Sequence, residues 1–400
     1  MRHRPSLSLA LAGFGSLAVN LGVALPALAS TDLSTALSRG TPHLQLRIRG
    51  ELVEQDNPLE DAAAATARAR LGYTTQVWKS WKGLLEFEAT EPFGGEAYNS
   101  LRNGNSGRSV VADPDGDEVN QAWLEYEGLP NTRLRLGRTR LVLDNARYIG
   151  NVGWRQNEQT YDGYLLTNAS LPDTRIVLAQ LNNANAPLFN NRAMDTQLLN
   201  LRYSGWSMAQ FTGYHYRINF DQSANDHKTT GVRVEGAAHL AGITWPWSLE
   251  HAVQTEHGEA NDFELDYWQF SAGVKTQPVL IAIGYEQLGS NGTQGFATPL
   301  ATLHGHNGWA DIFVNTPNEG LQDLSLKVAG KGLGFNWAVI GHDFTAARGG
   351  QSFGQELDVS LKRSLDGGLT GLLKFAVFEA ASGSNYVDTR KAWVQLEYEF

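Results

Sequence analysis

The 400-residue chain contains no cysteine. A disulfide framework, a thiolate metal site and a cysteine nucleophile are therefore excluded. Beyond residue 30 the chain also lacks any run approaching the ~18 uninterrupted apolar residues that a membrane-spanning helix needs. If the mature chain lies in a membrane, it must cross by strands, and its stability must come from backbone pairing and burial.

The N-terminal segment has the features of a secretory signal peptide. A basic start, MRHRP, precedes the apolar run LSLALAGFGSLAVNLGVALP, and Ala27-Leu28-Ala29 then forms an A-x-A cleavage site before Ser30. An uncleaved helical anchor is the alternative, but a proline and three glycines interrupt the run. We therefore predict a signal peptide over residues 1–29 and one domain over residues 30–400.

The stretch TRLRLGRTRL, residues 132–141, alternates apolar and charged side chains. A period of two belongs to a β-strand with two different faces, not to a helix. The same alternation recurs in HLQLRIRGEL and TARARLGYT. The predicted strands, eighteen in all, lie near residues 43–52, 66–74, 83–90, 119–128, 132–140, 160–169, 174–181, 195–204, 206–217, 229–240, 244–254, 264–275, 278–288, 321–330, 333–343, 355–364, 369–380 and 387–400.

The connections between these strands alternate between short and long. Tight turns such as residues 128–131, 241–242 and 366–368 are rich in Gly, Pro, Asn and Asp, and the largest loops span residues 91–118, 141–159 and 289–320. This asymmetry is typical of an antiparallel up-and-down transmembrane β-barrel, so the predicted fold class is all-β. A β-propeller or a secreted sandwich is the alternative, but neither requires strict alternation of loop length.

The chain ends in AWVQLEYEF, which alternates apolar and polar residues up to Phe400. This ending resembles the C-terminal assembly signal of Gram-negative outer-membrane barrels. The resemblance implies insertion into the outer membrane of a Gram-negative bacterium after signal-peptide cleavage, and it implies recognition of Phe400 by the barrel assembly machinery. Outer-membrane lipid and lipopolysaccharide are then the expected surroundings.

The apolar strand faces must point to lipid, because an Arg or Lys side chain that faces lipid at mid-bilayer costs roughly 2 to 4 kcal/mol. Arginines on the opposite faces are then predicted to lie in the lumen, together with several acids. These arginines are Arg47, Arg49, Arg68, Arg70, Arg133 and Arg135. Arg138 and Arg140 fall on the leucine face if the alternation continues, which predicts either a bulge at Gly137 or the end of the membrane-crossing strand.

Residues 120–166, NQAWLEYEGLPNTRLRLGRTRLVLDNARYIGNVGWRQNEQTYDGYLL, resemble a block of the alginate-export family of outer-membrane porins. The resemblance implies an eighteen-stranded barrel with an arginine-rich conduit, and alginate passage in the namesake members. The motif residues that it places at or near a constriction are Arg133, Arg135, Arg138, Arg140, Asp144, Arg147 and Arg155.

Two solute classes fit this prediction. We favour passive diffusion of small anionic or carboxylated solutes, because the chain is short for a polysaccharide exporter and has a net charge of -10. Export of alginate or a related polyuronate is the alternative. The loop at 141–159 carries charged and aromatic side chains, so it is expected either to fold inward and narrow the pore or to lie outside in solvent.

Other functional classes have less support. No pair of His and Ser residues stands out as a catalytic base and nucleophile, which speaks against a barrel hydrolase, while an adhesin stays open. The acidic balance argues against nucleic-acid binding. Asp113, Asp115 and Asp117 offer oxygen ligands for Ca²⁺ on a loop, but a solvated turn is the simpler interpretation, and His304-x-His306 is weak evidence for a metal. We therefore expect no metal and no cofactor.

Overall fold

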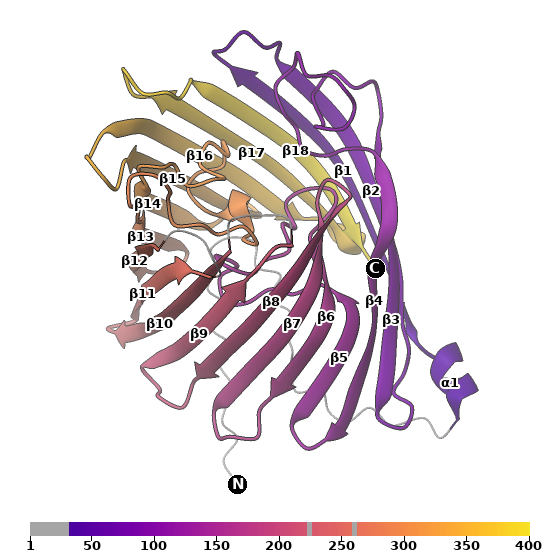
Figure 1. The fold of residues 1–400 in the computed structure, drawn as a ribbon. Coiled ribbons are helices and arrows are strands. Elements are labelled where there is room, and N and C mark those ends of the chain that lie inside the picture. Colours follow the sequence, from indigo (N-terminus) through magenta and orange to yellow (C-terminus); the bar gives the residue numbers. More distant parts are fainter. Residues whose placement is uncertain (1–31, 222–225, 258–261) are drawn as a thin grey trace.

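The computed structural model describes residues 32–221, 226–257 and 262–400, so the predicted signal peptide lies outside the described residues. The described residues contain eighteen β-strands, one short α-helix and two 3-10 turns, η1 (Leu303–Gly305) and η2 (Asp366–Gly368) (Figure 1). The helix and the strands are α1 (Leu33–Ser38), β1 (Thr41–Gln55), β2 (Ala62–Thr74), β3 (Trp81–Pro92), β4 (Gly116–Leu129), β5 (Thr132–Thr139), β6 (Thr160–Asn168), β7 (Thr174–Ala186), β8 (Asn190–Tyr203), β9 (Ala209–Ile218), β10 (His227–Leu240), β11 (Ile243–Glu256), β12 (Glu264–Lys275), β13 (Val279–Leu288), β14 (Leu321–Gly332), β15 (Phe335–Thr345), β16 (Ser352–Ser364), β17 (Leu369–Ala380) and β18 (Thr389–Glu399).

The strands close into a barrel. Each strand pairs antiparallel with its neighbours in the chain, and β1 pairs with both β2 and β18, for example Arg47 with Glu397. Closure leaves no unpaired strand edge exposed to the bilayer. The predicted transmembrane barrel of eighteen strands is therefore confirmed. No helix in the described ranges has the length and apolar character needed to cross a membrane.

The two faces of the strands differ as the alternation predicts. On β1 the side chains of Leu46 and Ile48 are 41% and 53% exposed, whereas Arg47 and Arg49 are 7% and 1% exposed. Leu46 and Ile48 therefore form part of an outward apolar belt that fits lipid, and the two arginines point inward.

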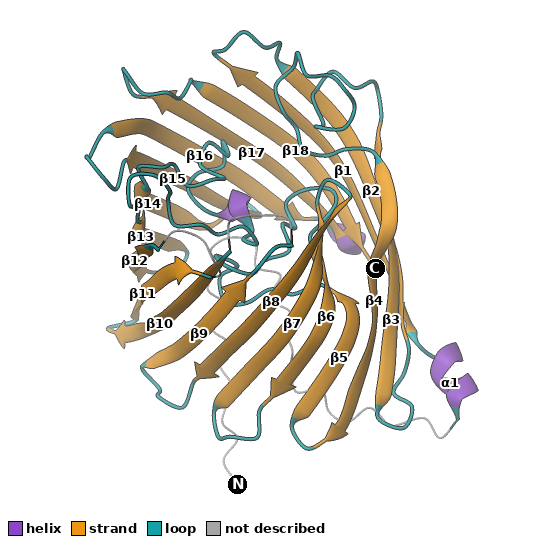
Figure 2. Ribbon diagram, in the orientation of Figure 1, coloured by secondary structure: helices purple, strands orange, loops and turns teal. Residues whose placement is uncertain are grey.

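The long connections fold into the barrel, where Figure 2 shows loops gathered inside the ring of strands. Ile149 of the loop between β5 and β6, and Leu300 and Trp309 of the loop between β13 and β14, belong to one hydrophobic core with inward wall residues such as Tyr267. The inward position predicted as one option for residues 141–159 is confirmed. The equally important role of residues 289–320 was not predicted.

Candidate functional site

The two inward loops are joined by backbone and side-chain contacts. Gly150 N donates to Leu300 O at 2.8 Å, and Thr302 N donates to Ala146 O at 3.0 Å. The Trp154 ring stacks on the His304 ring with a centroid distance of 4.4 Å. These contacts make the loops one packed unit that narrows the lumen.

Arg155 links this packed unit to the barrel wall. Its guanidinium lies 3.3 Å from Glu51 of β1 and 3.0 Å from Asp311 of the second loop. Arg155 therefore lies inside the barrel, and its charge is matched by two carboxylates.

The arginines of β1 hold the first loop by its backbone. Arg47 Nη1 donates to Gly153 O at 3.2 Å, and Arg49 Nη2 donates to Trp154 O at 2.6 Å. Arg47 also pairs with Glu397 at 3.2 Å, and Arg49 lies 3.5 Å from Asp113. These cations are therefore covered by loop atoms and neutralised.

The arginines of β2 behave in the same way. Arg68 Nη1 donates to Gln156 O at 3.3 Å and pairs with Glu397 at 3.4 Å. Arg70 contacts Glu88 and lies 3.5 Å from Glu158. The cluster predicted on the first two strands therefore anchors a loop.

Glu158 is a buried junction between the β2 wall and the segment that follows β5. Arg140 Nε donates to its carboxylate at 2.7 Å, and Asn120 and Asn151 each donate at 2.7 Å. Burial alone would raise the pKa of the Glu158 carboxyl, but Arg140 and Arg70 hold this pKa well below its usual range. The carboxylate therefore stays ionised, and the junction remains charged on both sides.

The β5 strand corrects one prediction. Pairing with β4 and β6 continues through Gly137 without a register shift at that residue, although its φ is 115°. The predicted bulge at Gly137 is therefore wrong, and the other option holds, since β5 ends at Thr139. Arg138 pairs with Asp162 at 2.8 Å, and Arg140 lies beyond the strand end.

The remaining motif residues are also paired. Arg135 lies 2.7 Å from Glu125 and sits over the Trp123 ring at 4.0 Å. Arg147 lies 2.9 Å from Glu286, and Asp144 lies 2.6 Å from Arg202. Ten of the eleven predicted site residues thus belong to ion pairs, and Arg133 is the exception.

Arg133 lines a small hollow of about 40 Å³ together with Arg175 of β7. Neither side chain forms an ion pair or hydrogen bond with the described residues, and Arg175 faces Arg202 across the β7–β8 pair. The hollow is also lined by Arg135, Arg140 and Glu125, and by Leu141 and Val142 of the first loop. The hollow is therefore a positively charged spot beside the packed loops.

The residues considered as possible metal ligands in the sequence, Asp113 and His304, have protein partners in the structure. Asp113 is 1% exposed and accepts from Gln156 N at 2.8 Å, so it faces the lumen rather than the solvent. His304 Nδ1 lies 2.7 Å from Asp311, and its Nε2 lies 2.6 Å from Lys374 Nζ. Within residues 32–221, 226–257 and 262–400, no group of three or more His, Asp or Glu side chains is arranged to hold a metal ion.

Residues 31–277 match the protein family described as alginate export, which covers more than half of the chain. The chain belongs to the alginate export family. No curated protein matches the sequence. The family description names export and no catalytic reaction.

Several solved structures share the fold of this alginate export family member. Pseudomonas aeruginosa OpdO has a TM-score of 0.72 at 12% identity, covering 92% of this chain and 98% of that chain. P. aeruginosa OpdK, solved with vanillate, has a TM-score of 0.71 at 12% identity, with coverage of 91% and 99%. Acinetobacter baumannii OccAB2 has a TM-score of 0.71 at 14% identity, with coverage of 92% and 99%. At these identities the likeness shows the fold alone.

Sequence patterns in this family member could not identify Arg175. Its strand reads TRIVLAQL, in which Ile176 and Leu178 lie on one face while Val177 and Ala179 are buried on the other. Both faces are apolar, so the period of two does not distinguish the lumen from the lipid side. Only the fold places Arg175 beside Arg133.

Proposed function

We propose that this protein is an outer-membrane pore for the passive diffusion of small anionic solutes, carboxylates above all. The observation that supports this proposal best is the hollow lined by Arg133 and Arg175, neither of which forms an ion pair with a described residue. Charged groups near low-dielectric walls raise the local concentration of the opposite ion and lower its entry barrier.

The local charge matters more than the net charge of -10. Glu125, the acid that lines the hollow, already pairs with Arg135 at 2.7 Å and with Lys82 at 3.0 Å. A solute carboxylate would therefore be attracted by Arg133 and Arg175, and a guanidinium can bind it with two parallel hydrogen bonds. The hollow fits the charged end of a solute, with the remainder in the pore.

The fold comparison supports the same solute class. OpdK was solved with vanillate, which is a small aromatic carboxylate. The two proteins share 12% identity, so their likeness shows a common fold and not a common solute. Passage of a small carboxylate through this chain is therefore part of our proposal.

Export of alginate or a related polyuronate is the second candidate, and the family description favours it. The packed loops weigh against it, because a polymer would have to displace the core formed by Ile149, Leu300 and Trp309. Uronate monomers and oligomers carry the same carboxylates. The two candidate functions therefore differ in the length of the uronate chain that can pass through the barrel.

The test is uptake by proteoliposomes that contain the purified barrel. We expect glucuronate to enter faster than uncharged glucose, and we expect R133Q/R175Q to remove this preference. R39Q is the control, because it removes one arginine from an exposed position next to α1. Equal glucose and glucuronate uptake by the wild type would contradict the proposal, and rapid release of alginate oligomers would favour the second candidate.

Membrane insertion forms part of the same proposal. Phe400 is 73% exposed, and its backbone pairs with Leu44 at 2.9 and 3.1 Å, so the terminal ring extends from the seam of the barrel. We propose that the assembly machinery recognises this ring after cleavage of residues 1–29. Deletion of Phe400 should lower the amount of folded barrel in outer-membrane fractions.

A further inference from the structure

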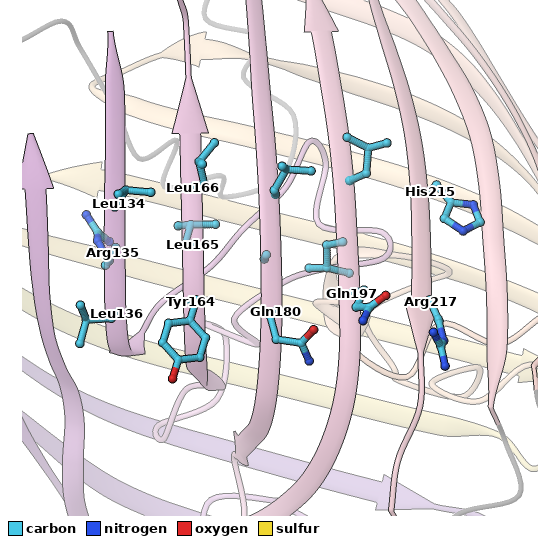
Figure 3. A pocket seen from close by; sticks show the side chains of 14 residues that line it. Leu134, Arg135, Leu136, Tyr164, Leu165, Leu166, Gln180, Gln197, His215 and Arg217 are labelled. Atoms are coloured by element: carbon cyan, nitrogen blue, oxygen red, sulfur yellow. The ribbon is translucent and has the colours of Figure 1, made fainter. Parts of the chain in front are cut away.

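The outer wall of the barrel carries an open groove of about 680 Å³ over β5 to β9 (Figure 3). Its floor is a row of four leucines joined by strand pairing. Leu134 pairs with Leu166, Leu166 with Leu178, and Leu178 with Leu199. Leu178 and Leu199 are 44% and 41% exposed on the outward face. The groove is thus an apolar surface with the width of several strands.

A second row borders the groove on the side of the long loops. Tyr164 pairs with Gln180, Gln180 with Gln197, and Gln197 with Arg217. Lys228 of β10 extends the row beyond Arg217. Figure 3 shows Tyr164, Gln180, Gln197 and Arg217 side by side along this edge of the leucine floor. An aliphatic surface therefore meets a polar row that ends in two cations.

Neither cation forms a salt bridge with the described residues, although Lys228 interacts electrostatically with Glu256. The nearby acid Asp195 accepts from Gln180 Nε2 at 2.6 Å. His215, at the end of the leucine row, lies 2.7 Å from Thr230 Oγ1 and supplies no negative charge. An outward Arg or Lys beside the bilayer is unfavourable unless it reaches an anionic group at the membrane surface.

His257, in the loop after β11, lies beside these two cations, and its pKa responds to their charges. Its ring contacts Arg217. Burial and then the charges of Arg217 and Lys228 lower the pKa of His257, although Asp226 and Asp195 oppose this effect. Arg217 and Lys228 lie side by side on paired strands, so one anion can contact both, while Asp195, Asp226 and Glu256 offset part of their charge.

We infer that the groove binds a phosphorylated glycolipid of the outer leaflet, with an acyl chain on the leucine row and a phosphate between Arg217 and Lys228. The long-loop rim of a transmembrane barrel faces the outer leaflet, and a lipid supplies both chemistries that the groove presents. A hydrocarbon chain covers Leu166, Leu178 and Leu199, while the glutamines of the second row offer hydrogen bonds to sugar hydroxyls. The inference depends on the barrel fold and is independent of which solute enters the lumen.

Native mass spectrometry of the detergent-purified barrel tests this site with lipid A as the probe. We expect the wild type to retain lipid A and R217Q/K228Q to lose at least tenfold in apparent affinity. The matched control is R390Q, which removes an exposed arginine at the loop end of β18. Heat-modifiable migration in gels confirms that each variant is folded.

Two further arms locate the site and identify the lipid. L178W places a large ring in the groove while staying on the lipid side, so it should weaken lipid A binding with both cations present. Phosphatidylglycerol and dephosphorylated lipid A should both bind more weakly than lipid A. Retention of lipid A by R217Q/K228Q, an equal loss in R390Q, or equal binding of phosphatidylglycerol would overturn the inference, and none of these outcomes bears on solute uptake.

Discussion

The arginines on the inner faces of β1 and β2 have surroundings opposite to those of two other arginines on the inner surface, Arg133 of β5 and Arg175 of β7. Arg49 is 1% exposed, donates to Gln395 and Trp154 and lies beside Asp113. Arg133 and Arg175 line a hollow without a carboxylate of their own. A buried and paired guanidinium organises loops, whereas an unpaired one is available to a solute. The comparison separates the lumen arginines into two sets by their electrostatic surroundings, one paired and one unpaired.

The largest expected effect follows from breaking the first set. R49M leaves Asp113 buried without its cation, and removing one partner of a buried ion pair costs about 3–5 kcal/mol. Urea unfolding in lipid vesicles, followed by tryptophan fluorescence, should show this loss in the free energy of unfolding. R133M should change this free energy by less than about 1 kcal/mol, because Arg133 has no partner to leave behind. Equal losses in the two variants would remove the distinction between the sets.

A smaller effect is expected from acid on the packed loops. Burial and the neighbouring Arg147 lower the pKa of His306 to about 4. The unfolded chain then binds a proton near pH 6.5 while the folded chain does not, so stability is fully present above pH 6.5 and is lost as the pH falls toward 4. The loss for this one histidine is up to about 3 kcal/mol.

Single-channel recording between pH 7 and pH 4 checks the acid effect. Loosened loops should increase the open-channel noise and the conductance as the pH falls through this range. H306Q cannot titrate there, so its pH dependence should be weaker than that of the wild type. An identical pH profile in H306Q would show that other groups control the loops.

The smallest effect is expected at the paired residues of the constriction. R155A leaves Glu51 and Asp311 without this cation and so adds negative charge to the lumen. Anion-over-cation permeability of R155A should fall by roughly twofold in a planar bilayer. R138A is the control, because Arg138 shares the face of Leu134 and Leu136 on β5. Unchanged selectivity in R155A, or an equal fall in R138A, would exclude Arg155 from the permeation path.

Much of the barrel follows from alternation alone. The segments HLQLRIRGEL and TARARLGYT predict β1 and β2 and the inward direction of their arginines, because a period of two assigns every side chain to one of two faces. The tight turns were identified by their residue types, and the loop lengths predicted which rim carries the long loops.

The partners of the arginines could not be predicted in this way. Glu158 and Asp311 lie in loops whose paths depend on packing with distant segments, as in the contact between Gly150 and Leu300. Arg175 lies in a strand with two apolar faces, so its pattern gave no signal. Sequence periodicity determines the face of a residue, whereas its electrostatic role depends on which loops cover that face.

The reversal potential under a tenfold KCl gradient tests the separation of the two arginine sets most directly. The wild-type channel should prefer chloride, and R133Q/R175Q should shift the reversal potential toward that of an unselective pore while the R39Q control keeps the wild-type value. If R133Q/R175Q retains the chloride preference of the wild type, the unpaired arginines do not select anions and the account is wrong.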